Sequence, residues 1–384
     1  MFNDIYPDLQ VSYKTYRKIF NSDFNISFGY PRTDTCLKCD EIKISIEKAS
    51  KDLSNNPDSE QLKQALQKLQ LERDVHQRKA DTFYRRKREA RLKASKDPNF
   101  EVITIDFNKN LSLPNITTND FYYRRKLTFL SFNIHLLSSN EVFIYSYDET
   151  IAKKGADEVT SILFHFFMNH LSGEIKHLEL FCDSCAGQNK NYTMIRFLDF
   201  LVNQRERFDS IKISFPERGH SYLECDKDMG LINCKAHAST PSDWHEIFRA
   251  ARKNPSPYNV IEQNQDMVKN MTQFLKPVYK AGFPVPMRPL KEVMFSKKSL
   301  GVISHRDSWN GPILNTTILS NARRSNKAVN IGEPVRLYIK KIIISLAKYK
   351  DLQVLKKFTS APEFYDSLEH DETNDDPLDD LSDD

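Results

Sequence analysis

Three aspartates stand at positions where a carboxylate is costly unless something compensates it. Asp106 lies inside the apolar run VITIDF, Asp183 closes the run IKHLELFCD, and Asp226 lies in GHSYLECDKD. A charge in an apolar strand requires a partner, and a divalent cation is the usual partner of several carboxylates. Mg²⁺ takes oxygen ligands, and two such ions roughly 3.5–4 Å apart promote phosphoryl transfer. The three acids therefore indicate a site for Mg²⁺ or Mn²⁺ that acts on phosphate esters.

The same acids also have ordinary structural interpretations. An Asp at a strand end often caps a turn or a helix, and Asp183 is followed by Ser184 and Gly187, which suit such a turn. Asp228 lies two positions after Asp226 and competes with it for the third place in the set. The spacing leaves the choice between Asp226 and Asp228 open.

The elements that must position these acids follow from the hydrophobic periodicity. Short apolar runs predict strands, and longer amphipathic stretches predict helices. In chain order we expect strands at 102–107, 126–137 and 141–148, a helix at 155–171, a strand at 175–183, a helix at 191–204, a strand at 210–216 and a helix at 221–238. The sequence thus predicts an α/β protein of order β-β-β-α-β-α-β-α, with Asp106 and Asp183 on strands and Asp226 on the last helix.

Four local motifs point to a family. FGYPRTDTCLKCD, YSYDETIAKKGADEV, FCDSCAGQNKNYTMIRFLDFL and FPERGHSYLECDKDMGLI together resemble a mostly uncharacterised family of eukaryotic proteins linked to mobile elements. That family carries a D-(N/S)-C-x-G-Q-N-K-N motif and a G-H-(S/T)-x(4)-D motif. The resemblance covers about residues 10–255 and extends to the ribonuclease-H-like core of DDE/D transposases. Because family members usually extend further at the N-terminus, we expect a truncated copy.

The resemblance implies a transposon-derived protein that cuts or joins DNA strands. Asp106, Asp183 and Asp226 would hold Mg²⁺ or Mn²⁺, and water or a 3′-hydroxyl would attack the phosphate. An alternative is a catalytically inactive, domesticated or degenerate copy that binds nucleic acid or protein, and a third is a nuclease that acts on RNA. The expected location is nuclear or nucleocytoplasmic, and a homo-oligomer is compatible with this class.

Four more residues are candidates for supporting roles at the acids. By analogy with ribonuclease H, Glu158 is an auxiliary ligand. Gln188 and Asn189 could contact a phosphate or orient Asp183 through amide hydrogen bonds, or they could cap the next helix. His220 could bind metal, act in acid–base chemistry or hold the third acid in place, or it could be a plain turn residue.

Cys36 and Cys39 have the spacing of half a zinc site. They precede the first of two helices that the sequence predicts as a hairpin, separated by SNNPDS. His76, on the second helix, is the nearest third ligand, and the sequence does not identify the fourth. Zinc here would hold the hairpin together, whereas the alternative is a pair of reduced structural thiols.

Basic residues suggest a polyanionic partner. Arg85, Arg86, Lys87 and Arg88 begin a run with charges all round a helix, which can follow a phosphate backbone, serve as a nuclear localisation signal, or form a solvated face. Arg124 and Arg125 follow FYY, a cluster that could stack bases or pack at a strand start. We therefore expect nucleic acid, in the first place DNA, as the partner.

Composition limits the remaining classes. The chain has 384 residues, six Cys, ten Gly and 11% aromatic residues, which argues against a disulfide scaffold and against wholesale disorder. No apolar run is long enough to span a bilayer, and no secretory signal is visible. The net charge of +4 averages a basic body and a final stretch, 369–384, with nine acids. We divide the chain into a hairpin region (1–98), a ribonuclease-H-like core (99–255), an accessory region (256–360) and a disordered acidic tail (361–384).

Overall fold

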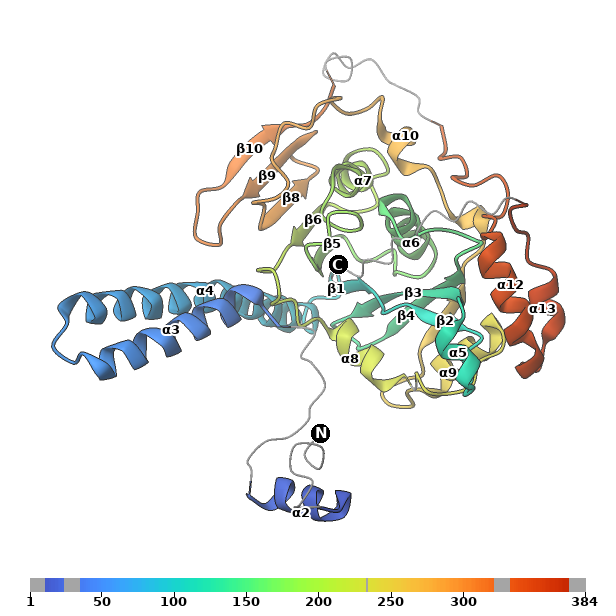
Figure 1. The fold of residues 1–384 in the computed structure, drawn as a ribbon. Helices are drawn as coiled ribbons and strands as arrows, with labels where there is room; N and C mark the ends of the chain where they lie inside the picture. The colour runs from blue at the N-terminus through green and yellow to red at the C-terminus, as the bar shows by residue number, and fades with distance from the viewer. Residues whose placement is uncertain (1–10, 24–34, 233, 321–331, 373–384) are drawn as a thin grey trace.

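A ten-stranded mixed sheet forms the centre of the protein (Figure 1). The computed structural model describes residues 11–23, 35–232, 234–320 and 332–372. The strands are β1 (Phe100–Phe107), β2 (Leu111–Leu113), β3 (Leu127–Leu136), β4 (Val142–Asp148), β5 (His177–Cys182), β6 (Ser210–Ser214), β7 (Asn259–Glu262), β8 (Glu292–Ser296), β9 (Val302–Arg306) and β10 (Leu314–Thr317). Their order is β10-β9-β8-β6-β5-β1-β3-β4-β7, and β2 pairs with β3. The predicted α/β class with a mixed sheet is confirmed.

The sheet is parallel at its centre and antiparallel around it. β1 runs parallel to β5, and β5 runs parallel to β6. β1, β3 and β4 form an antiparallel meander, and β8, β9 and β10 continue antiparallel from β6. β7 adds to β4 in parallel. β7 to β10, which lie within residues 256–360, therefore complete the same sheet.

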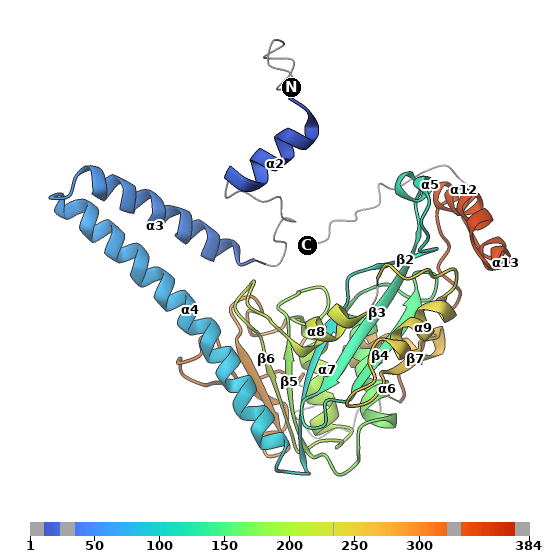
Figure 2. The ribbon, with the colours of Figure 1, turned by 90° about the horizontal axis from the view of Figure 1, so that it is seen from below.

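Helices cover both faces of the sheet. The helices are α2 (Tyr13–Asp23), α3 (Leu37–Asn55), α4 (Glu60–Ala94), α5 (Asn119–Tyr123), α6 (Ala156–Asn169), α7 (Tyr192–Asn203), α8 (Glu224–Leu231), α9 (Pro241–Ala250), α10 (Met271–Leu275), α12 (Leu346–Leu355) and α13 (Pro362–Asp366), with single 3₁₀ turns η1 (Gln265–Met267) and η2 (Lys356–Phe358). α6 and α7 pack on one face, in a core with Ile103 and Ile105 of β1. α8, α9 and the end of α4 lie on the opposite face, as Figure 2 shows.

The predicted hairpin is present, and half of it belongs to the body. α3 and the first part of α4 project together, whereas the last part of α4 lies against the sheet (Figures 1 and 2). There Phe83, Ala90 and Ala94 pack with Val102 of β1 and Phe181 of β5. Phe83 is fully buried, and burial of such a side chain contributes about 1.5–3 kcal/mol. α4 is therefore docked on the core.

Within the described parts of the chain, no helix is both long and apolar enough to cross a membrane.

Three sequence expectations need correction. The helix expected at 221–238 ends at Leu231, because the following chain pairs with the residues after β2, through Asn115 and Ala238. The apolar pattern of residues 334–348 also predicts a helix, and this prediction is wrong. The backbone there bonds to other segments, for example Leu337 N to Val268 O, so it cannot form helical bonds, and α12 begins at Leu346.

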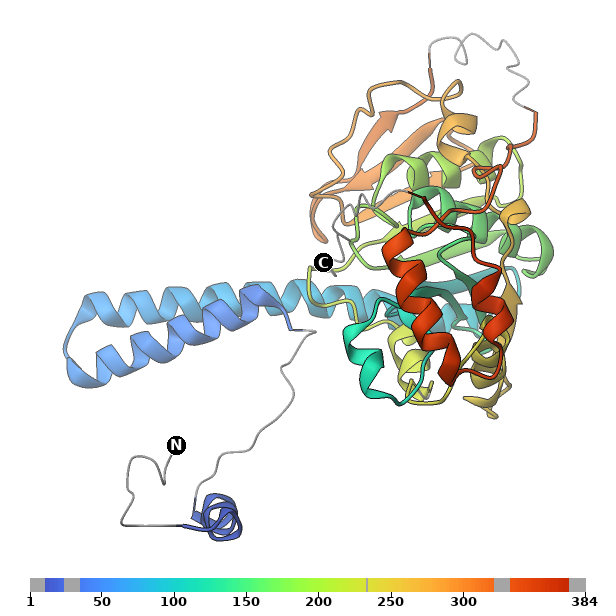
Figure 3. The same ribbon diagram turned by 45° about the vertical axis from the view of Figure 1, so that its right-hand side comes forward.

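The sequence predicts the start of the disordered acidic tail at residue 361, which is too early because residues 362–366 form α13. α13 packs beside α12 (Figure 3, red), and Tyr365 is fully buried with its hydroxyl 2.5 Å from Ser239 O. The remainder of that tail, 373–384, lies outside the described residues.

Candidate active site and metal cluster

Asp106 and Asp183 lie side by side at the end of the central parallel pair. Ile105 of β1 is level with Cys182 of β5, so the next position on each strand carries an acid. Side chains alternate along a strand, and Thr104, on the same face as Asp106, contacts Cys225 of α8 with its hydroxyl 3.3 Å from Sγ. The two acids therefore occupy the sheet face that α8 covers, where Asp226 begins that helix.

Both Asp183 and Asp226 act electrostatically on Asp106. Burial raises the pKa of Asp106 well above its usual 3.8, and the charges of Asp183 and Asp226 raise it further. Burial also raises the pKa of Asp183, while hydrogen bonds from Asn189 and the Cys185 backbone oppose this. Lys154 lowers the pKa of both strand acids and is the nearby cation. Mutual repulsion of this kind favours a cation between the groups.

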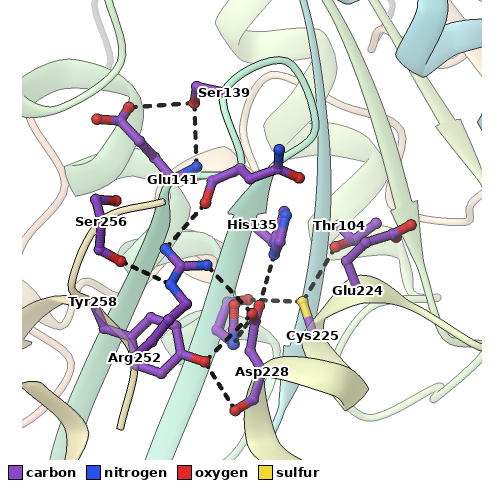
Figure 4. Close-up of polar contacts among 12 residues, drawn as sticks. Thr104, His135, Ser139, Glu141, Glu224, Cys225, Asp228, Arg252, Ser256 and Tyr258 are labelled. Carbon is purple, nitrogen blue, oxygen red and sulfur yellow. Dashed lines mark hydrogen bonds and ion pairs between the residues drawn. The ribbon is translucent and has the colours of Figure 1, made fainter. Parts of the chain in front are cut away.

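The structure separates Asp226 from Asp228. The exposed Asp226 accepts a hydrogen bond from Leu223 N at 2.8 Å and acts electrostatically on Asp106. Asp228 is buried and belongs to a polar network (Figure 4). His135 Nδ1 donates to it at 2.7 Å, and Arg252 forms an ion pair at 3.7 Å. Asp228 therefore anchors α8, and of the two acids Asp226 is the one that acts on Asp106 and remains the candidate for the third position.

The amide motif after β5 serves Asp183 directly. Asn189 is fully buried, and its Nδ2 donates to Asp183 Oδ1 at 2.5 Å. The helix cap falls instead to Asn191, which accepts from Met194 N at 2.9 Å. Gln188 is half-buried, and its backbone carbonyl accepts from Asn191 Nδ2 at 3.0 Å. Asn189 thus orients the carboxylate of Asp183.

Glu158 has a structural position. Its Oε2 accepts from Gly155 N at 3.0 Å, and its Oε1 accepts from the Tyr338 hydroxyl at 2.5 Å. Both carboxylate oxygens are used at the start of α6, so this geometry does not favour the auxiliary-ligand role expected from the analogy with ribonuclease H.

A Cys2His2 cluster is the most compact ligand group in the described residues. The ligand atoms of Cys36, Cys39, His76 and His220 all lie within 4.8 Å of one another. Cys36 Sγ is 3.2 Å from His76 Nε2, and Cys39 Sγ is 3.3 Å from His220 Nε2. This cluster could hold a metal ion. Asp106, Asp183 and Asp226 form a looser group.

His220 is the member of this cluster that sequence reasoning could not assign to it. The sequence places it near the third acid, whereas the structure puts its Nε2 3.1 Å from His76 Nε2. The two histidines are 144 positions apart, so no local spacing could pair them. Burial, followed by the charge of His220, lowers the pKa of His76. A lowered pKa keeps the imidazole neutral, as a metal ligand must be.

Two of the four basic residues at 85–88 pack against the body of the protein, and the other two are exposed. Arg86 donates to Glu292 at 2.9 Å, and Lys87 donates to Glu224 at 2.8 Å. These two residues dock α4 on the body, so the expectation that the whole run presents charge to a polyanion needs correction. Arg85 and Arg88 are exposed.

Arg124 and Arg125 both pair with Asp351 of α12, at 3.1 Å. Beside them, Tyr122 and Tyr123 are 81% and 75% exposed. The aromatic side chains are therefore the more exposed parts of this cluster, while the two arginines are partly engaged by Asp351.

The fold and site together define an α/β protein with a mixed sheet, a docked helical hairpin and a Cys2His2 cluster. A domain family described as a domain of unknown function, DUF7869, matches residues 134–288. The matched segment is less than half of the chain. It contains Asp183, His220 and Asp226 but neither Asp106 nor the hairpin. A search of curated proteins finds no match.

Proposed function

We propose that the protein is a transposase-like, metal-dependent phosphoryl-transfer protein with a ribonuclease-H-like core. The supporting arrangement is the strand order β6-β5-β1-β3-β4, with an antiparallel meander followed by two parallel strands. In the ribonuclease-H-like fold the acids lie on the first and fourth strands and on the helix after the fifth. When the short β2 is left out, these elements correspond to β1, β5 and α8. The observation that carries the proposal is the placement of Asp106, Asp183 and Asp226 at those positions on one sheet face.

The chain's own residues would prepare the site for Mg²⁺ or Mn²⁺. The cations supply charge that activates the attacking oxygen and stabilises the leaving one. Asn189 holds Asp183 in one orientation. The test is cleavage and strand transfer on DNA and RNA with Mg²⁺ or Mn²⁺. Metal-dependent activity supports the proposal, and its absence on every substrate contradicts it.

Acid pH should stabilise the metal-free protein and weaken its metal binding. Because the pKa of Asp106 and of Asp183 is raised in the folded state, the native chain keeps these protons to higher pH than the unfolded chain. The free energy of unfolding should therefore fall as pH rises from about 3.8 through the raised values. Asp106→Asn should reduce this slope in urea titrations without metal. An unchanged slope in the variant would contradict the electrostatic coupling.

We further propose a structural Zn²⁺ at the Cys2His2 cluster. Two thiols and two imidazoles are the ligand set of closed structural zinc sites. In the metal-free cluster, burial and the neighbouring Cys36 raise the pKa of Cys39 to about 11, and a bound cation would offset this by favouring the thiolate. The proposed partner of the whole protein is nucleic acid, in the first place DNA, and the proposed location is nuclear or nucleocytoplasmic.

The second candidate is a non-enzymatic module that binds nucleic acid. The looser spacing of the acids relative to the Cys2His2 cluster favours it, as do exposed Arg85, Arg88, Tyr122 and Tyr123. A protein that binds DNA but neither binds Mg²⁺ nor cleaves would support this candidate over the first.

Both candidates predict that Arg85 and Arg88 contribute to DNA binding. Replacing both with Ala should make the negative slope of log affinity against log salt concentration shallower by about 1 to 2. Each phosphate contact displaces roughly one counterion, and the double variant lacks up to two contacts. The control is Arg205→Ala with Lys297→Ala, whose side chains pair with Glu333 and Asp209 at other edges. Equal slopes in the two double variants would exclude the exposed face of α4 as a DNA-binding surface.

A further inference from the structure

The four ligands of the Cys2His2 cluster come from three separate parts of the fold. Cys36 and Cys39 lie at the start of α3, His76 lies in α4, and His220 lies in the loop between β6 and α8. A tetrahedral zinc site places its ligand atoms roughly 3.3–3.8 Å apart. The contacts of 3.1–3.3 Å through Sγ and Nε2 atoms are close to this. A metal here would join the hairpin to the core as well as α3 to α4.

The loop that carries His220 is shaped to meet the cysteines. Gly219 has a φ of +77°, and a Cβ at this position would lie 2.6 Å from Cys36 Cα and 2.9 Å from its Cβ. Both the backbone conformation and the close approach exclude larger residues. The Gly-His pair therefore brings His220 to the cluster by direct backbone contact with the turn of the two cysteines.

The same loop leads directly to the third acid. The carbonyl of Tyr222 and the carboxylate of Glu224 both accept from Lys87 Nζ of α4 at 2.8 Å. Leu223 N donates to Asp226 at 2.8 Å. The segment 219–226 thus contacts α4 at two places. The first is the Cys2His2 cluster, through His220, and the second is Lys87, which binds the segment next to Asp226. Only three residues separate His220 from Glu224, the first residue of α8.

We infer that Zn²⁺ at the Cys2His2 cluster is a clasp that fixes segment 219–226 against the hairpin and thereby positions Asp226. Its role at the acids depends on the proposed phosphoryl-transfer function, whereas the clasp itself does not. His220 is in this assignment a zinc ligand and a positioning residue. It is not an acid–base group.

The test compares the full chain with His220→Ala and with Gly219→Ala. Zinc content, the visible spectrum after Co²⁺ substitution, hydrogen exchange of segment 219–226 and Mn²⁺ titration are measured on each. Matched controls are His237→Ala, an exposed histidine whose ring contacts Thr117, and Gly173→Ala, where an added Cβ meets open space. Variants are preferred to chelators, which would also remove Mn²⁺.

The expected result is one zinc per chain and a tetrahedral thiolate–cobalt spectrum in wild type and both controls. Loss of an outer-shell partner already weakens metal binding roughly 10–100-fold, so His220→Ala should lose at least that much zinc affinity. Exchange of segment 219–226 should become at least about tenfold faster, with weaker Mn²⁺ binding. Gly219→Ala should show the same changes while its far-UV circular dichroism stays that of wild type.

Three outcomes would overturn the inference. These are a wild type that takes up neither zinc nor cobalt, zinc loss that leaves exchange of 219–226 unchanged, and zinc loss with unchanged Mn²⁺ affinity. If wild type binds no Mn²⁺ at all, the proposed phosphoryl transfer fails. The clasp is then judged on zinc content and exchange alone, which separates the two failures.

Discussion

Asp183→Asn is expected to abolish metal-dependent strand cleavage and the heat of Mg²⁺ or Mn²⁺ binding. The substitution keeps the shape of the side chain but removes the charge beside Asp106. Loss of a metal that contributes several kcal/mol to the transition state lowers the rate by on the order of 10³-fold or more. Calorimetry and single-turnover cleavage measure the two effects.

The matched control is Asp209→Asn. Asp209 directly precedes β6 and pairs with Lys297 at 2.9 Å, so it lies at the opposite end of the parallel strands from Asp183. Cleavage and metal binding should equal those of wild type. Metal-free Asp183→Asn should be at least as stable as wild type in urea, since a buried repulsion is removed. Equal metal binding by wild type and Asp183→Asn would exclude Asp183 as a ligand.

Asp228→Ala is expected to lower the free energy of unfolding by about 3–5 kcal/mol. The change removes the acceptor of His135 and leaves Arg252 buried, 8% exposed, without its ion pair. Breaking a buried pair by deleting one partner typically costs this much. Urea unfolding of the metal-free protein, followed by intrinsic fluorescence, measures the loss.

Asp226→Ala is the comparison for the neighbouring acid. It should cost only about 1 kcal/mol, the value of a helix cap, yet weaken metal binding strongly. The opposite pattern, with stability lost at Asp226 and metal lost at Asp228, would reverse the assignment of these two acids.

Periodicity was sufficient for the order of elements from β1 to α8, except for the short β2 and α5, which it did not predict. Strands such as β1 carry predominantly apolar runs, and helices such as α7 carry an apolar stripe, so local pattern and burial agree. The strand-end positions of Asp106 and Asp183 followed from the same runs. The helical hairpin, with Cys36, Cys39 and His76 as ligand candidates, was also readable, because its stripes and turn are local.

Periodicity failed where nonlocal bonds replaced local ones. Residues 334–345 contain an apolar run that suits a helix, but their backbone groups bond to Val268, Thr150 and Glu369. Residues 361–372 look like the start of an acidic tail, yet Tyr365 fills a gap beside α12. Such partners are distant in the chain and leave no spacing signal.

The sequence by itself determined the α/β class, the hairpin and the acids at two strand ends, because each depends on neighbours a few residues away. Only the tertiary structure decided which chemistry the other groups can perform. It brought His220 to His76 across 144 positions, turned Asp228 into a buried anchor and left Asp226 beside Asp106. It also paired Arg86 and Lys87 with the body. Ligand sets and ion pairs form between residues that are close in space but distant in the chain, so only the folded structure identifies them.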